Sequence, residues 1–303
     1  MAIGDIISAD DYNSIRNKIV PVIGAGSGNS GYGQLVQSSA VSAGNIVTKS
    51  QWDNLRFDIY NSLIHQTGSA PNITNVAINS VIRYGAAQPV FQYDTLSTTA
   101  VTNRFDLGTG RFATLAGDTT SRNFTWSTSA TATVTVTFAT SNQARFFFNS
   151  GGKIRFTSSL GNNGDSKSQN TSWINLLAGA GTRQFGGNTP SVNFYTLTSS
   201  YQTWFTTTAT SPYAQNNYRL DALCNVANNS SGTANSVTFR AVWTDGYTDP
   251  PGGAPGQFPP EDGVNGTLSL IVDQIKATGD ILPSGSFTIA GPASITASTI
   301  SGS

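Results

Sequence analysis

Apolar side chains recur at helical spacing in two stretches near the start of the chain. Residues 7–19 and 48–67 are each expected to form a short helix with one apolar face, because their aromatic and aliphatic residues lie three and four positions apart. The two faces consist of Tyr12, Ile15 and Ile19 in the first stretch and Trp52, Leu55, Ile59 and Leu63 in the second. Helices this short are marginal in water, so both faces are expected to pack on each other or on a neighbouring subunit.

Capping residues indicate where these helices begin and end. Ser8 and Asp11 stand three positions apart, as do Thr48 and Gln51, and this is the spacing of a capping box. Pro21 is expected to stop the first helix, because proline lacks the amide proton that continues a helix.

The two stretches are copies of one unit. Residues 4–19 align with residues 44–59 at a constant offset of 40 residues, with the glycine, the aliphatic positions, the aromatic and an arginine in step. Repeated units usually bury their apolar faces against one another or against a partner. Residues 1–70 are therefore predicted to be a helical repeat module that serves assembly, with the two apolar faces named above as its interface.

From about residue 80 the apolar period changes to two, which is the period of a β-strand. Residues 131–138 alternate strictly between threonine and apolar side chains, and faces of the same period recur in residues 218–226 and 237–243. Strands of this kind separated by turn residues predict an antiparallel β-sandwich or jelly-roll-like domain over residues 71–248.

One hairpin is expected inside this domain. Residues 145–148 and 153–156 are rich in aromatic and β-branched side chains, and residues 149–152 between them carry Asn, Ser and two glycines. Such residues favour a tight turn, so the two segments are predicted to pair as neighbouring strands.

The last part of the chain changes character again. Residues 249–263 are rich in proline and glycine and predict an extended linker. Residues 264–303 hold one good strand and then short β-prone pieces, too few to bury a core of their own. This tail is expected either to pack on the sandwich or to wrap with two further copies as a stem. The whole pattern predicts a mainly β protein with a small N-terminal helical module and a short, fibre-like C-terminal tail.

Composition narrows the choice of partners. Charged residues make up 11% of the 303 residues, against about 25% in an ordinary domain. The formal net charge is +0, so no general attraction to nucleic acid or to an anionic membrane is expected. No apolar run is long enough to span a bilayer, and the first residues do not read as a signal peptide.

Residues that carry chemistry are few. The chain has one histidine, His65, and one cysteine, Cys224, so a His–His metal pair and an intrachain disulfide are both excluded. The glycine-rich residues 24–34 lack the Lys-Ser or Lys-Thr of a phosphate-binding loop, which favours a plain turn. Six aspartates could serve two-carboxylate hydrolysis, but their spacing selects no pair. They are Asp94, Asp106, Asp118, Asp165, Asp221 and Asp245. No catalytic residue, metal or cofactor is predicted, and the chain is expected not to be an enzyme.

Aromatic residues give a weaker indication of function. Several lie among Ser, Thr, Asn and Gln between residues 173 and 218, and rings with amide neighbours suit a sugar-binding surface as well as a core or a protein interface. Trp173 and Trp204 are the candidate glycan contacts, because polar residues surround them in the sequence.

Several of these segments resemble one family of proteins. Residues 7–16 (ISADDYNSIR), 31–34 (GYGQ) and 51–55 (QWDNL) are similar to the N-terminal region of virion structural proteins of tailed bacteriophages, especially those of marine cyanobacteria. Residues 144–155 (ARFFFNSGGKIR) resemble a segment found in the same proteins. The resemblance implies a component of a phage particle and carries no active site with it.

These observations predict a non-enzymatic structural protein of the virion, at the tail, neck or baseplate, that binds other virion proteins through its N-terminal module. A homo-oligomer is expected, with a trimer favoured, because trimerisation would cover exposed strand edges. Three alternatives stay open: a carbohydrate-binding protein that recognises a host surface glycan, a polysaccharide depolymerase, and a head decoration protein.

Overall fold

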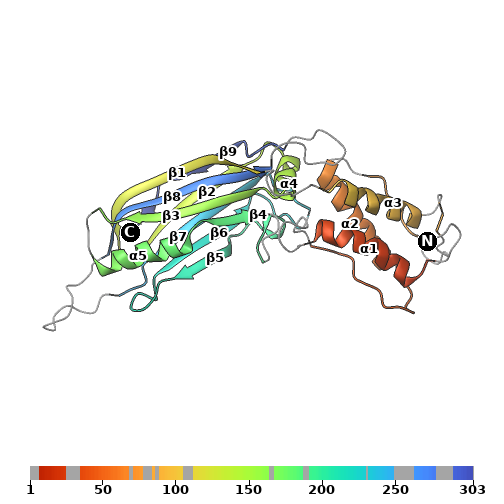
Figure 1. Ribbon diagram of the computed structural model, residues 1–303, viewed down its shortest axis with the longest axis horizontal. Coiled ribbons are helices and arrows are strands. Elements are labelled where there is room, and N and C mark those ends of the chain that lie inside the picture. The colour runs from red at the N-terminus through yellow and green to blue at the C-terminus, as the bar shows by residue number, and fades with distance from the viewer. Residues whose placement is uncertain are drawn as a thin grey trace.

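The first three helices and the two β-sheets occupy opposite ends of an elongated molecule in the computed structural model (Figure 1). The structure describes residues 7–24, 35–67, 71–77, 84–85, 89–104, 112–163, 167–186, 191–229, 231–248, 263–277 and 289–302. The described residues leave out most of the glycine-rich loop and most of the proline-rich linker. They also leave out residues 278–288 of the tail and the side chain of His65.

The helical part begins as the capping pattern predicts. Helix α1 (Ala9–Ile23) starts after Ser8, whose side chain and Asp11 form a reciprocal capping box. Helix α2 (Lys49–Thr67) starts in the same way, because the Thr48 amide donates to Gln51 Oε1 over 2.8 Å and the Gln51 amide donates to Thr48 Oγ1 over 3.3 Å. The predicted stop at Pro21 is wrong, since α1 continues to Ile23. Pro21 lies in the last turn, and beyond it the Gly24 amide still donates to the carbonyl of Val20.

A third helix, α3 (Pro89–Thr102), completes this part of the molecule. It packs against both α1 and α2, although it lies beyond residue 70, where the sequence pattern ends the helical module. The ring of Trp52 lies 5.1 Å from that of Tyr12 and 5.7 Å from that of Tyr93, so an aromatic from the first turn of each helix meets at one point. Tyr93 follows Trp52 by 41 residues, so α3 occupies the place of a third, degenerate repeat.

The three helices run parallel. Their first turns meet at the three rings, and near their far ends Gln66 Nε2 on α2 donates to the carbonyl of Ala100 on α3 over 2.7 Å. The C-terminal ends face the strands, because Val22 of α1 belongs to the core of the strand part and α2 contacts α4. The turns that precede the helices therefore point away from the strands.

Two antiparallel sheets form the other part of the molecule. The four-stranded sheet has the order β1 (Phe112–Trp126), β8 (Val264–Ala277), β3 (Lys153–Gly161), β4 (Arg183–Gly186). The six-stranded sheet has the order β10 (Ser301–Gly302), β2 (Ser129–Thr137), β7 (Ser236–Thr244), β6 (Asn217–Cys224), β5 (Gln202–Thr208), with β9 (Ser294–Ala297) also paired to β2.

The sheets face each other across one apolar core. The rings of Phe156 on β3 and Phe239 on β7 lie 4.8 Å apart, and Trp243 Nε1 donates to Ser158 Oγ over 2.9 Å. Strand β2 buries its alanines and valines and turns its threonines outward, as the strict alternation predicts. The faces predicted for residues 218–224 and 237–243 are buried as well, whereas Val226 is exposed.

The predicted hairpin at residues 145–156 is wrong in its first half. Residues 145–148 lie in helix α4 (Ser141–Asn149), which begins after Thr140, whose side chain accepts a hydrogen bond from the Gln143 amide. Three consecutive phenylalanines are buried because α4 is covered on several sides, so no helical stripe is visible in the sequence. Gly152 then leads into β3, and it packs so closely that a Cβ there would lie 2.5 Å from the carbonyl oxygen of Phe147.

The C-terminal segment is not a fibre-like tail. Strand β8 lies between β1 and β3 in the middle of its sheet, and β9 and β10 pair with β2 in the other sheet. Of the two arrangements expected for residues 264–303, packing on the sandwich is therefore the observed one. The sequence does not reveal this because the strands that pair with β8 lie more than a hundred residues away.

The fold as a whole is mixed, because five α-helices accompany the strands of the described residues. The predicted antiparallel sheets are present, and the helices add to them. Helix α5 (Ser168–Ala180) contacts β3 and β8 of one sheet and β5 of the other, so it lies across the open edge between the sheets (Figure 1).

Candidate functional site

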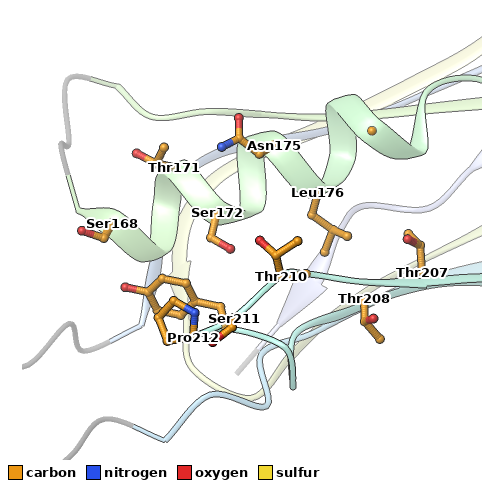
Figure 2. A pocket seen from close by; sticks show the side chains of 13 residues that line it. Ser168, Thr171, Ser172, Asn175, Leu176, Thr207, Thr208, Thr210, Ser211 and Pro212 are labelled. Carbon is orange, nitrogen blue, oxygen red and sulfur yellow. The ribbon is translucent and has the colours of Figure 1, made fainter.

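A pocket of about 420 Å³ opens between α5 and the turn that joins β5 to β6 (Figure 2). The side chains that line it in the described part of the chain are uncharged. From α5 they are Ser168, Thr171, Ser172, Asn175 and Leu176, and from the strand and turn they are Thr207, Thr208, Ala209, Thr210, Ser211, Pro212 and Tyr213.

Helix α5 forms the first wall and is fixed from beneath. Trp173 and Leu177 point into the core and are buried. At the start of the helix, Gln169 Nε2 donates to Asp245 Oδ1 over 2.7 Å, and Asn170 Oδ1 accepts from the Asn265 amide over 2.9 Å. Ser172 and Leu176 point from this fixed helix toward the β5–β6 turn, and Thr171 and Asn175 lie at the outer rim of the pocket (Figure 2).

The β5–β6 turn forms the second wall and is closed by its own hydrogen bonds. The Tyr213 amide donates to the carbonyl of Thr210 over 3.0 Å, and the Asn216 amide donates to the carbonyl of Tyr213 over 2.9 Å. Asn216 Oδ1 accepts from the amides of Gly246 and Tyr247, which ties the turn to the segment after β7. The rings of Tyr213 and Tyr247 pack edge to face with centroids 4.7 Å apart. The turn is therefore held in one shape before any ligand arrives.

The chemistry of this lining is that of binding. Hydroxyl groups and one amide can donate and accept hydrogen bonds, while Leu176, Pro212 and the ring of Tyr213 offer apolar surface. Apart from the Tyr213 phenol, no titratable side chain is among the described lining residues. The described part of the chain also contains no group of three His, Cys, Asp or Glu side chains suited to a metal ion.

The residues predicted to form the assembly interface lie inside the helical part instead. All seven are buried in one cluster with side chains of α3: Tyr12, Ile15, Ile19, Trp52, Leu55, Ile59 and Leu63. The expected attachment through these faces is therefore corrected, because α1, α2 and α3 already cover them. The sequence pattern shows that the faces need a partner but does not show that the partner is a third helix of the same chain.

The two candidate glycan contacts lie in the core. Trp173 is fully buried and packs against Trp126 at 5.9 Å, so its ring has no surface to offer. Trp204 is partly buried between Phe156 and Phe185, at 5.8 and 5.5 Å. The pocket residues that sequence reasoning missed do carry a signal, since the polar side chains of α5 at positions 168, 171, 172 and 175 follow helical spacing.

The aspartates considered for hydrolysis take part in structural contacts. Asp94 accepts from Lys18 Nζ over 2.6 Å and from the Tyr84 hydroxyl over 2.9 Å. Asp118 accepts from the Ala297 amide over 2.7 Å. Asp221 is held by Arg240, Arg219 and Thr203, and Asp245 binds Gln169. Asp106 and Asp165 lie outside the described residues.

Cys224 is a core residue of β6. It is buried, and burial raises the pKa of its thiol, which disfavours the reactive thiolate at neutral pH.

Comparison with protein-family models, with curated proteins and with solved structures gives no match for this chain. Among the described residues, no helix has both the length and the apolar composition needed to cross a membrane.

Proposed function

We propose that this chain is a non-enzymatic structural component of a bacteriophage particle, in which the helical part attaches to other virion proteins and the strand part projects. The observation that carries the proposal is the separation of two independent apolar cores at opposite ends of the molecule (Figure 1). A molecule built in this way can be held at one end while the other end stays free. The family resemblance of residues 7–16 and 51–55 supports the same role.

Attachment is assigned to the surface of the helical end. The turns before the helices point away from the strands, and the turn before α2 carries Ile46 with 87% of its surface exposed. A depression of about 550 Å³ lies beside it, lined by residues 40–42, 44–46, 48 and 51. An aliphatic side chain this exposed gains free energy when a partner covers it.

The contacts of the aspartates support a structural role over a hydrolytic one. Asp94, Asp118, Asp221 and Asp245 each bind amide, hydroxyl or cationic groups of the chain itself.

A homo-oligomer stays part of the proposal. Its support is now β1, a 15-residue strand at the edge of its sheet, which a second copy could cover.

Incorporation into particles tests the proposal directly. Phages that carry Ile46→Asp are compared with phages that carry Ile271→Asp, a change at a 46% exposed isoleucine on the strand part. Quantitative mass spectrometry of purified particles is expected to show the Ile271→Asp chain at the normal copy number and the Ile46→Asp chain strongly depleted. Absence of the unmodified chain from purified particles would overturn the proposal, and equal incorporation of both variants would remove the helical end as the attachment surface.

A further inference from the structure

We infer that the pocket between α5 and the β5–β6 turn binds an uncharged saccharide. This inference does not depend on the structural role, because it concerns a surface of the strand part, at the end opposite to the attachment surface proposed above.

The polar groups of the pocket match a ligand rich in hydroxyl groups. Ser172 points from α5 toward Thr210 on the turn, whereas Thr171 and Asn175 lie on the rim of the pocket, on the side of the helix that faces away from the turn (Figure 2). Hydroxyl and amide side chains both donate and accept, so they can satisfy sugar hydroxyls whichever way these point. Among the described residues that line the pocket there is no lysine, arginine, aspartate or glutamate, so these residues offer an anionic or cationic ligand no charge to pair with.

The apolar groups of the pocket match the C–H groups on the faces of a sugar ring. A pyranose presents C–H groups on its faces, and these need apolar surface when they leave water. Leu176 from α5, with Pro212 and Tyr213 from the turn, supplies such surface beside the hydroxyl groups. Small-molecule sites combine apolar lining with a few placed polar groups in volumes of about 300–1,000 Å³, and this pocket of about 420 Å³ lies in that range.

The rigid walls of the pocket help its uncharged polar and small apolar side chains to bind a ligand. Helix α5 is fixed by Trp173 and by the hydrogen bonds of Gln169 and Asn170, and the turn is fixed by Asn216 and by the ring contact of Tyr213 with Tyr247. A preformed site does not have to order its own side chains when the ligand arrives, which reduces the free-energy cost of association.

The experiment measures saccharide binding to the purified full-length chain. A panel of neutral hexoses, N-acetylhexosamines and their disaccharides is screened by saturation-transfer NMR, together with hexuronic acids and sialic acid. Hits are then titrated by calorimetry. We expect at least one neutral saccharide to bind and the anionic sugars not to bind.

Variants locate the site. Ser172→Ala is expected to weaken binding about fivefold, the effect of one lost hydrogen bond. Ser50→Ala, at an exposed serine of α2, is the matched control and is expected to change nothing. Tyr213→Phe should keep the affinity within about twofold, because it retains the ring, whereas Tyr213→Ala should lose it.

Three outcomes would overturn the inference. These are no binding by any neutral saccharide of the panel, binding confined to the anionic sugars, and neutral binding that Ser172→Ala leaves unchanged. Because the assay uses the isolated chain, each of them would leave the result on particle incorporation as it stands.

Discussion

Single polar residues in this protein are held in place by partners on neighbouring strands. Asp221 on β6 shows this best, since its buried carboxylate accepts hydrogen bonds from Thr203 on β5 and from Arg240 on β7. Arg240 in turn lies over the ring of Tyr201, 4.1 Å from its centroid. Burial alone would raise the pKa of Asp221, but these bonds and the charges of Arg219 and Arg240 hold its pKa below the ordinary value.

Replacement of Asp221 with Asn tests this network. The folded-state pKa lies below the unfolded-state value of about 3.9, so the carboxylate stabilises the fold above about pH 4, and this contribution is lost as the pH falls through the folded-state pKa. Urea unfolding is expected to show Asp221→Asn less stable by about 2 kcal/mol at neutral pH, the worth of hydrogen bonds to a charged group. The difference from the unmodified chain should shrink as the pH is lowered toward 3.

A control separates this effect from the loss of any negative charge. Asp53 pairs with Lys49 on the surface of α2, with about a third of its side chain exposed. Asp53→Asn should cost less than about 0.5 kcal/mol, because exposed ion pairs contribute little. The claim that the ionised Asp221 carboxylate stabilises the fold would be contradicted by equal losses of unfolding free energy in the two variants. A loss for Asp221→Asn that does not depend on pH would contradict it as well.

The sequence predicts some helices and strands of this protein better than others. The sequence predicts strand β2 from its strict alternation and β7 from the apolar residues at every second position from Val237 to Trp243, because each strand buries one full face. Helix α3 escaped prediction because two of its four buried positions are Ser97 and Ala100, which do not read as apolar anchors. The sequence does not predict helix α4 either. The helix is buried on several sides, so its apolar residues are consecutive and show no helical period.

The helical part depends on one ring. Trp52 lies between Tyr12 and Tyr93, so Trp52→Ala would leave a cavity where all three helices meet. The expected loss is about 3–5 kcal/mol, measured as early loss of the helical circular-dichroism signal in a urea titration. The remaining tryptophans all lie in the strand part, and their fluorescence should report a second transition at an unchanged urea concentration.

Phe57 on the same helix provides the comparison. It is 43% exposed, so Phe57→Ala should cost less than about 1 kcal/mol. If Trp52→Ala were as mild as Phe57→Ala, the three rings would not be the centre of the helical part.

At the scale of the whole molecule, the two ends of the strand region come together. Strand β8 pairs with β1 along 14 residues and with β3 on its other side, so it completes a sheet that begins at residue 112. Strand β2 likewise receives β9 and β10 from the end of the chain. The strand part is therefore one folding unit closed by its C-terminal segment.

Truncation distinguishes this arrangement from a free tail. A chain that ends at residue 262 should fail to fold its strand part, because β1 and β3 lose the strand between them. A chain that lacks only residues 301–303 should keep its fold, since it loses just the two pairs of β10. Tryptophan fluorescence and limited proteolysis measure both outcomes. A stable, cooperatively unfolding strand part in the shorter chain would show that β8 is dispensable.

By itself the sequence determined the features that depend on neighbouring residues. The capping boxes at Ser8 and Thr48, the two apolar helix faces and the alternation of β2 and β7 all follow from spacing along the chain, because caps and periods are local. Tertiary structure alone decided what covers each face. It buried the two helix faces against α3 and placed Trp173 in the core. It also inserted β8 between β1 and β3 and brought α5 beside the β5–β6 turn to form the pocket. These contacts join residues far apart in the chain, and a pattern of polar and apolar positions shows that a face must be covered without showing by what.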